Sequence, residues 1–225
     1  MTQLKPFAWS FSALSAFETC PRRYYLTKVS KEVSEPQTEA TLWGNRVHKA
    51  LELRITTQQP LPSSMAEFED TAATVVKRAE GGKIGAEQRM ALTKSFKPTT
   101  FFAKDAWVRG ITDFTIEKGS NLFIGDWKTG KPKPESAQLR LTAAITFAHK
   151  PHVKQITNAF VWLKTGTLTV ERFTREDVPT IWQEFMPRVQ RVEHALKDNK
   201  FPPKPSGLCR AWCPVGRSLC EHCGV

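Results

Sequence analysis

Two runs of apolar, β-branched and aromatic residues, broken by single polar positions, lie near the middle of the chain. They cover residues 106–116 and 122–128, and their alternation is typical of β-strands that bury one face. Gly119 and Ser120 lie between them and suit a two-residue turn with glycine first. The sequence therefore predicts a β-hairpin in which Lys118 pairs with Asn121.

The remaining pattern predicts helices on either side of further strands. Apolar residues with helical spacing indicate helices over residues 41–53, 63–80 and 135–148. A short helix capped by Ser12 ends at Cys20, and a last helix bends at Pro187. Residues 155–163 and 167–173 have the composition of strands, whereas residues 83–104 suit either short strands or a loop. These elements favour a mixed α/β sheet flanked by helices.

Two aspartates of the hairpin carry the main functional signal. Counting outward from the turn places Asp113 opposite Asp126, with Lys128 on the same face. Like charges directly opposite each other destabilise a sheet, but a divalent cation between the carboxylates removes the conflict. The alternative is that Asp113 belongs to a turn and Lys128 to a charged strand end. The two matched aspartates favour metal-assisted phosphodiester hydrolysis, with the Lys128 ammonium orienting the attacking water.

Composition and charge agree with a nucleic-acid partner. The chain has 225 residues, 40% of them apolar, which suffices for one domain spanning residues 1–225. Its first residues lack the apolar segment of a signal peptide, and we expect a cytoplasmic protein without a membrane span. The net charge of +11 favours a polyanion such as DNA, although a uniformly basic surface would give the same charge.

Five cysteines add a second candidate site. Cys20 lies near the start, and the other four lie within the last 20 residues, at Cys209, Cys213, Cys220 and Cys223. In a cytosolic chain this grouping favours metal or iron–sulfur ligation over disulfides. The four C-terminal thiols could bind Zn²⁺ by themselves, or Cys20 and three of them could hold a 4Fe-4S cluster. Spacing leaves both alternatives open.

Several short motifs, in this order, resemble the RecB-type nucleases of the PD-(D/E)XK superfamily, in particular their iron–sulfur branch, which includes phage and CRISPR-adaptation exonucleases. Residues 10–24 are similar to the opening segment of that family, and residues 44–52 to its G-x-x-x-H-x-x-L-E helix. Residues 110–113 and 126–128 resemble its two core motifs, and Gln138 matches the start of its Q-x-x-x-Y helix. By itself, His48 would be an ordinary helical histidine.

The resemblance implies a restriction-endonuclease-like fold and assigns roles to individual residues. His48, Asp113, Asp126 and the Trp127 carbonyl would bind Mg²⁺ or Mn²⁺, Lys128 would position the water, and Gln138 would help place Lys128 or the DNA backbone. A 4Fe-4S cluster with a structural role would be held by Cys20, Cys209, Cys213 and, as the preferred fourth ligand, Cys220. Residues 1–30 and 200–225 would form this cysteine-cluster region.

The sequence departs from the family pattern at two places. Thr142 stands where the family usually has tyrosine. The C-terminal cysteines are spaced one residue more widely than usual, and Cys223 is surplus to the four ligands. Glu87 is a candidate for an acidic residue that some relatives carry upstream of the core motifs, but its surroundings are too irregular to align.

We expect a metal-dependent DNA nuclease, in particular an exonuclease acting on single- or double-stranded ends in recombination, repair or phage DNA processing. Recombination or replication proteins would be its partners. The alternatives are a non-catalytic DNA-binding subunit that retains the cluster, and a zinc-stabilised nucleic-acid-binding protein. The set of Asp113, Asp126 and Lys128 argues for catalysis.

Overall fold

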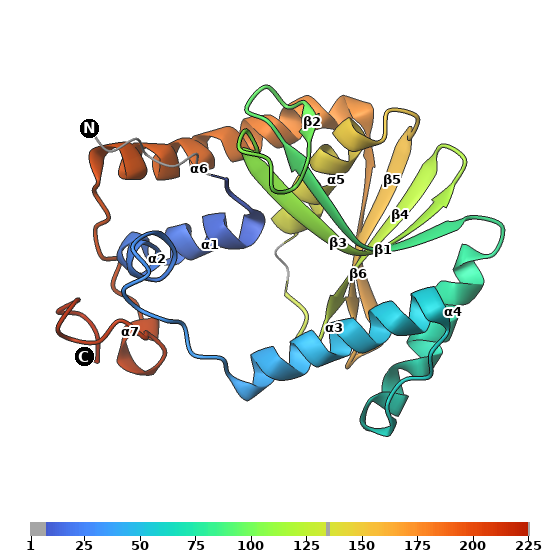
Figure 1. The fold of residues 1–225 in the computed structure, drawn as a ribbon, viewed down its shortest axis with the longest axis horizontal. Helices are drawn as coiled ribbons and strands as arrows, with labels where there is room; N and C mark the ends of the chain where they lie inside the picture. The colour runs from blue at the N-terminus through green and yellow to red at the C-terminus, as the bar shows by residue number, and fades with distance from the viewer. Residues whose placement is uncertain (1–7, 134–135, 225) are drawn as a thin grey trace. The chain divides into compact units, whose positions relative to one another are not determined.

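The computed structural model describes residues 8–133 and 136–224 (Figure 1). The chain divides into two compact units. We call Glu39–Gln183 the sheet unit, and Met1–Thr38 together with Glu184–Val225 the cysteine unit. Helix α6 (Val178–Asp198) begins in the sheet unit and ends in the cysteine unit.

The sheet unit contains one six-stranded mixed sheet in the order β2-β1-β3-β4-β5-β6. Strands β4 and β5 are parallel, and all other neighbours are antiparallel. The predicted mixed sheet flanked by helices is confirmed. The strands are β1 (Lys83–Leu92), β2 (Pro98–Thr99), β3 (Val108–Lys118), β4 (Asn121–Lys128), β5 (Gln155–Trp162) and β6 (Thr167–Thr174).

The β3–β4 hairpin has the predicted register. Lys118 pairs with Asn121, and Gly119 has a φ of 58°, as the first residue of a type II′ turn requires. The ladder continues to the pair of Phe114 and Gly125. Beyond that pair the strands no longer bridge, which frees the next residues for the site described below.

Residues 83–104, which the sequence left open between strands and loop, contain β1 and β2. Strand β1 pairs with β3 from Lys83–Glu117 to Leu92–Val108, so it lies beside the hairpin along nearly its whole length. Glu87 interrupts the ladder with a φ of 47°, in the left-handed region. This distortion and the polar residues around it explain why the sequence shows no clear strand pattern here.

Helices α3 (Glu39–Thr57) and α4 (Glu69–Ala79) cover one face of the sheet (Figure 1). Their buried side chains share a core with Phe114 and Trp127, whose rings stack with centroids 4.4 Å apart. Before α4, residues Ser63–Phe68 form a 3-10 helix, so the single helix predicted over 63–80 is wrong in its first turns.

Helix α5 (Ala137–His149) covers the opposite face of the sheet (Figure 1). Buried Asn158 of β5 donates its side-chain N–H to the Leu139 carbonyl oxygen at 2.8 Å. Ser136 is the N-cap of α5, and the expected start at residue 135 lies outside the described residues. The predicted strands over 155–163 and 167–173 are confirmed as β5 and β6.

The cysteine unit contains short helices around the last turns of α6. These are α1 (Phe11–Thr19), α2 (Pro21–Tyr24), the π-helix Tyr25–Val29 and α7 (Leu208–Ala211). Ser10, and not Ser12 as expected, caps α1, because its side chain accepts a hydrogen bond from the Ala13 backbone N–H. Glu18 of α1 forms ion pairs with Arg188 and Arg191 of α6.

No described helix is long and apolar enough to cross a membrane. The expected single domain over residues 1–225 stays a prediction, as does the cysteine-cluster region of residues 1–30 and 200–225. The first residues, on which the expected lack of a signal peptide rests, lie outside the described part of the chain.

Candidate functional site

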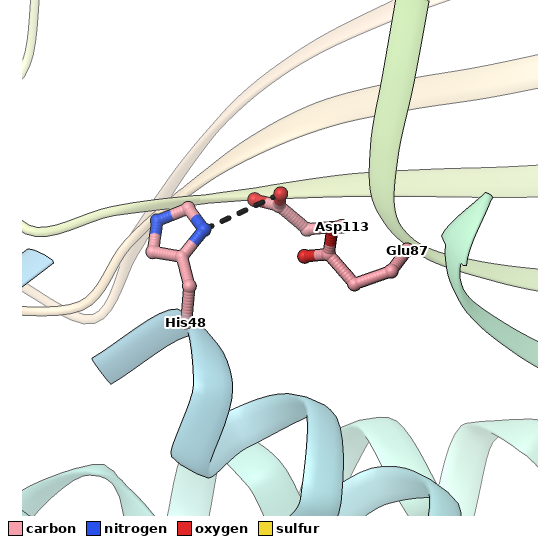
Figure 2. A group of neighbouring side chains, drawn as sticks. All are labelled: His48, Glu87 and Asp113. Atoms are coloured by element: carbon pink, nitrogen blue, oxygen red, sulfur yellow. Dashed lines mark ion pairs between the residues drawn. The ribbon is translucent and has the colours of Figure 1, made fainter. Parts of the chain in front are cut away.

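Three potential metal ligands from three elements of the sheet unit converge at one point. His48 on α3, Glu87 on β1 and Asp113 on β3 place their ligand atoms within 4.8 Å of one another (Figure 2). The Nδ1 atom of His48 lies 3.3 Å from Oδ1 of Asp113. An imidazole nitrogen and two carboxylates are a donor set that suits a divalent cation such as Mg²⁺ or Mn²⁺. We call these residues the acidic group.

Backbone geometry aims each of the three side chains. Val47 and Leu51 are fully buried against the sheet, which turns the next residue, His48, along the edge of the helix toward β3. Asp113 points across the end of the β3–β4 ladder, where its Oδ2 accepts a hydrogen bond from the Trp127 backbone N–H at 2.6 Å. This side-chain bond takes the place of a missing ladder bond.

Glu87 is the member that the sequence left unassigned. The constant register of β1 with β3 puts it opposite Asp113, and its positive φ redirects the side chain at that point. A non-glycine residue in the left-handed region stores strain, and such strain concentrates at functional positions. A single acidic residue in an irregular segment was the available signal, and it could be assigned only once β1 was known to pair with β3.

A second set of residues lies directly beyond the acidic group. Oδ1 of Asp126 accepts a hydrogen bond from the Gln138 amide at 2.8 Å, and its Oδ2 lies 2.5 Å from the Lys128 ammonium. Lys128 also donates to Oε1 of Gln138 at 3.1 Å and lies 4.6 Å from the ring centroid of Phe160. These contacts fix the ammonium, and two of its three donors are used. We call Asp126, Lys128 and Gln138 the lysine set.

Negative charge is concentrated between the two sets. Burial, followed by the charge of Asp113, raises the pKa of Asp126 to about 6. Burial and the nearby carboxylates of Asp113 and Glu52 raise the pKa of Glu87. Burial lowers the pKa of His48, but the hydrogen bond and charge of Asp113 together outweigh burial and raise it. A divalent cation would relieve this crowding of carboxylates, so the residues fit a metal ion.

The structure therefore brings the predicted residues together in a different grouping from the one expected. The hairpin register would place Asp113 and Asp126 opposite each other, but the described ligand atoms within 4.8 Å include Glu87 and not Asp126. The Asp126 carboxylate is occupied by Lys128 and Gln138. The metal-binding and catalytic roles of these residues stay predictions.

Comparison with known families decides the identity of the fold. A family model described as the PD-(D/E)XK nuclease superfamily matches residues 8–221, nearly the whole chain. The chain belongs to the PD-(D/E)XK nuclease superfamily. The six-stranded mixed sheet of this nuclease agrees with the restriction-endonuclease-like fold that the sequence predicted.

Two solved structures match the chain at low sequence identity, and the first of them shows the same fold. A protein of Eubacterium rectale named "Putative exonuclease" is 13% identical, with a TM-score of 0.53, over 89% of this chain and 85% of that one. The structure of SSO0001 is 12% identical, with a TM-score of 0.48, over 98% of this chain and 87% of that one. None of the curated proteins matches the sequence.

All five cysteines of this nuclease line one small cavity within the cysteine unit, together with Arg22, Arg23 and His222. The Sγ of Cys20 accepts a hydrogen bond from the Lys204 backbone N–H at 3.5 Å, and the Sγ of Cys209 accepts one from Ser206 at 3.4 Å. Backbone N–H donors of this kind stabilise thiolate sulfur. Among the described residues, however, no three of these sulfur atoms lie within 4.8 Å of one another as the acidic group does, so the predicted metal or iron–sulfur site stays a prediction.

Cys223 differs from the other four thiols. It is buried, and its Sγ donates to the Cys213 carbonyl oxygen at 3.5 Å. Burial, together with the neighbouring Cys223, raises the pKa of Cys213. A thiol that uses its proton in an internal hydrogen bond is a poorer ligand than a thiolate, and Cys220 as the fourth ligand stays a prediction.

Proposed function

We propose that the protein is a metal-dependent deoxyribonuclease that hydrolyses phosphodiester bonds at the acidic group. The observation that carries the proposal is the meeting of His48, Glu87 and Asp113 beside an ammonium that is held in place. A bound Mg²⁺ or Mn²⁺ would polarise the scissile phosphate and make a water molecule more acidic. The superfamily of the chain supports this proposal.

The ligands in this proposal are His48, Glu87, Asp113 and Asp126, with the Trp127 carbonyl oxygen. Glu87 joins the set expected from sequence because its carboxylate lies within 4.8 Å of the other two ligand atoms. Asp126 would serve as a further ligand through its carboxylate, which also contacts the Lys128 ammonium.

Lys128 orients the attacking water and offsets the charge that develops on the phosphate. Its remaining ammonium donor is the group available for this task, because Asp126 and Gln138 occupy the other two. Gln138 acts as a positioning residue, since its amide links the Asp126 carboxylate to the Lys128 ammonium. Such fixed hydrogen-bond donors lower the barrier because they need no reorganisation during the reaction.

DNA is the proposed substrate, and cleavage from an end is the proposed mode. The net charge of +11 favours a polyanion. The Eubacterium rectale protein with the same fold is named as an exonuclease, which supports the exonuclease mode. The RecB-type motifs at His48, Asp113 and Gln138 support a role in recombination, repair or phage DNA processing.

Digestion of end-labelled linear and circular DNA tests the proposal, with single and double strands and with Mg²⁺, Mn²⁺ or EDTA. We expect metal-dependent cutting that requires an end, and a loss of about 100-fold or more in Asp126→Ala and Lys128→Ala. Lys118→Ala, an exposed lysine at the hairpin turn, is the matched control and should cut normally. Normal cutting by Asp126→Ala and Lys128→Ala would overturn the assignment.

We further propose that the cysteine cavity holds a 4Fe-4S cluster through Cys20, Cys209, Cys213 and Cys220, with Zn²⁺ as the alternative occupant. The cluster would join a thiolate of the N-terminal segment to thiolates of the C-terminal segment. It would thereby close a long loop of the chain and stabilise the cysteine unit. Arg22 and Arg23 line the same cavity, and their positive charge would balance the anionic cluster.

Metal analysis and the visible spectrum of anaerobically purified protein separate the two occupants. A brown protein with about four irons per chain supports the cluster, whereas a colourless protein with stoichiometric zinc rejects it. Protein without either metal would show that the thiols are not ligands.

A further inference from the structure

Two arginines and two phenylalanines form a compact surface patch in the sheet unit. The guanidinium of Arg89 lies 5.8 Å from the ring centroid of Phe101 and 5.9 Å from that of Phe102. The guanidinium of Arg109 lies 5.4 and 6.0 Å from the same two rings. We call these four residues the aromatic–arginine patch.

The patch faces the side of the sheet from which His48 approaches. Met90 and Gly110 pair with each other and point toward α5, because Met90 Sδ contacts Thr146 and a Cβ at Gly110 would lie 3.2 Å from Ile145. Arg89 and Arg109 precede these two residues in β1 and β3, so alternation directs them to the opposite face. That is the face covered further along the strands by α3, which carries His48.

The patch also lies close to the acidic group along the strands. Arg89 is two residues from Glu87, and Arg109 is four residues from Asp113, which corresponds to about 7 and 13 Å along a strand. Burial and the charge of Asp113 raise the pKa of Glu87, whereas the positive charge of Arg89 lowers it. Ile111, an exposed residue of β3, pairs with Arg89 across the two strands.

The guanidinium groups of Arg89 and Arg109 lack carboxylate partners among the described residues. Among residues 8–133 and 136–224, neither guanidinium forms an ion pair, and both lie over the phenylalanine rings. The Nε atom of Arg109 is buried without a hydrogen-bond partner. Two like charges held side by side without a carboxylate are stabilised when an anion such as a phosphate binds.

Phe102 is exposed in a way that the core does not explain. Its side chain is 74% exposed, whereas the neighbouring Phe101 is partly buried beneath it and meets it edge to face at 5.1 Å. A rigid aromatic ring at the surface, supported by a second ring and flanked by arginines, is the arrangement on which unpaired bases stack. Bases in a duplex already stack on one another and cannot cover such a ring.

We propose that the aromatic–arginine patch binds single-stranded DNA next to the scissile phosphate, with a base stacked on Phe102 and the backbone phosphates on Arg89 and Arg109. This inference rests on the proposed function and deepens it, since it names an unpaired strand as the substrate segment that this side of the acidic group receives. The same side of the sheet would then carry both strand binding and cleavage.

Fluorescence anisotropy in EDTA tests this proposal without cleavage. Three labelled probes of equal length are needed: a mixed-sequence single strand, the same strand with abasic sites, and a blunt duplex. Phe102→Ala should weaken binding of the single strand about tenfold and leave the abasic strand and the duplex nearly unchanged. Phe102→Trp should restore binding, because tryptophan also offers a stacking face.

The arginines should behave differently from the ring. Arg89→Ala and Arg109→Ala should weaken binding of the normal and abasic strands alike, and each should reduce the slope of log affinity against log salt by about one. Leu168→Ala and Arg172→Ala are matched controls, since both residues are exposed on the distant edge strand β6. They should bind all three probes normally.

Equal losses on single strand and duplex for Phe102→Ala, or no loss on either, would overturn base stacking at Phe102. Unchanged binding in both arginine variants would overturn the whole patch. These outcomes are distinct from failure of the proposed nuclease activity: a protein that binds the single strand through Phe102 but never cuts DNA with Mg²⁺ or Mn²⁺ would contradict the nuclease proposal alone. Thermal unfolding of each variant verifies that it is folded.

Discussion

The acidic group and the cysteine cavity are both assembled from residues far apart in sequence, but they are held together in different ways. The acidic group lies on long elements, one helix and two paired strands, and two of its side chains, His48 and Asp113, form an ion pair. The cysteine cavity is lined by residues from turns and from α2 and α7, two helices of four residues each. The sulfur atoms of Cys20 and Cys209 accept backbone hydrogen bonds at 3.4–3.5 Å.

The difference indicates how much each site depends on its occupant. The fold positions the acidic group, because the β1–β3–β4 ladders and the α3 core remain when a metal ion leaves. The cysteine cavity has few long-range backbone ladders to position it, so a bound cluster or metal would contribute stability as well as chemistry. Activity should therefore be lost by changes in the acidic group, and stability by changes at the cysteines.

The largest expected effect concerns Glu87. Glu87→Gln should lower nuclease activity about 100-fold or more, because it removes a carboxylate from the acidic group, while the melting temperature changes little. Steady-state rates at increasing Mn²⁺ and thermal unfolding measure both quantities. Glu67→Gln, at an exposed position of the same unit, is the control. Full activity in Glu87→Gln would remove Glu87 from the site.

Cys209→Ala tests the other side of the comparison. It should remove the iron or zinc and lower the stability by about 3 kcal/mol, the size expected when a tightly bound group is lost. Cys223→Ala should retain the metal, because that thiol donates a hydrogen bond to the Cys213 carbonyl oxygen. Metal analysis measures the iron or zinc content, and calorimetry measures the stability. Identical metal content in wild type and Cys209→Ala would exclude Cys209 as a ligand.

Gly125→Ala tests whether the packing of Phe114 and Trp127 beneath the site affects stability and activity. A Cβ at Gly125 would overlap the Phe114 ring, which stacks on Trp127 next to Asp126. We expect a loss of about 1–3 kcal/mol in unfolding free energy and reduced activity. Gly110→Ala is the matched control, since its Cβ would meet the movable end of Ile145 at 3.2 Å. Equal effects of the two substitutions would contradict this packing argument.

The smallest effect is expected at Glu117, which lies away from both sites and serves as a reference for surface electrostatics. Hydrogen bonds from Lys150 and His152 lower the pKa of Glu117 below 4.5. Because its folded pKa is depressed, its contribution to stability is present above the unfolded pKa and is lost as the pH falls through the folded pKa. Glu117→Gln should lower the melting temperature slightly at pH 7, and the difference should shrink below pH 4.5. A difference that grows in acid would contradict this assignment.

The sequence allowed the hairpin to be predicted with its register. Alternation and the Gly119–Ser120 turn are local signals, and a two-residue turn leaves one possible pairing. The same approach could not give the partner of Asp126, because the ladder stops after Phe114 and Gly125 and the side chains then choose between neighbours from other elements. Local pattern therefore predicted where Asp113 and Asp126 lie along the strands, and not what they bind.

Residues 83–104 show the limit most clearly. Their irregular pattern did not allow β1 to be predicted. The positions of Glu87 and Arg89 beside β3 follow only from the pairing of β1 with β3. The 3-10 helix at Ser63–Phe68 and the N-cap at Ser10 were likewise missed. In both places a serine side chain can hydrogen-bond to more than one nearby backbone group, and the sequence does not show which bond forms.

Fold class, the order of the main elements, the excess of positive charge and the residue types capable of binding metals can all be inferred from the amino-acid sequence, because periodicity, turn chemistry and composition act locally. Only the tertiary structure decided which of those residues meet: Glu87 with His48 and Asp113, Lys128 with Asp126 and Gln138, and the arginines with Phe101 and Phe102. The physical reason is that strand pairing and helix packing join segments far apart in the chain, and a distance of a few ångströms between side chains is set by that long-range packing.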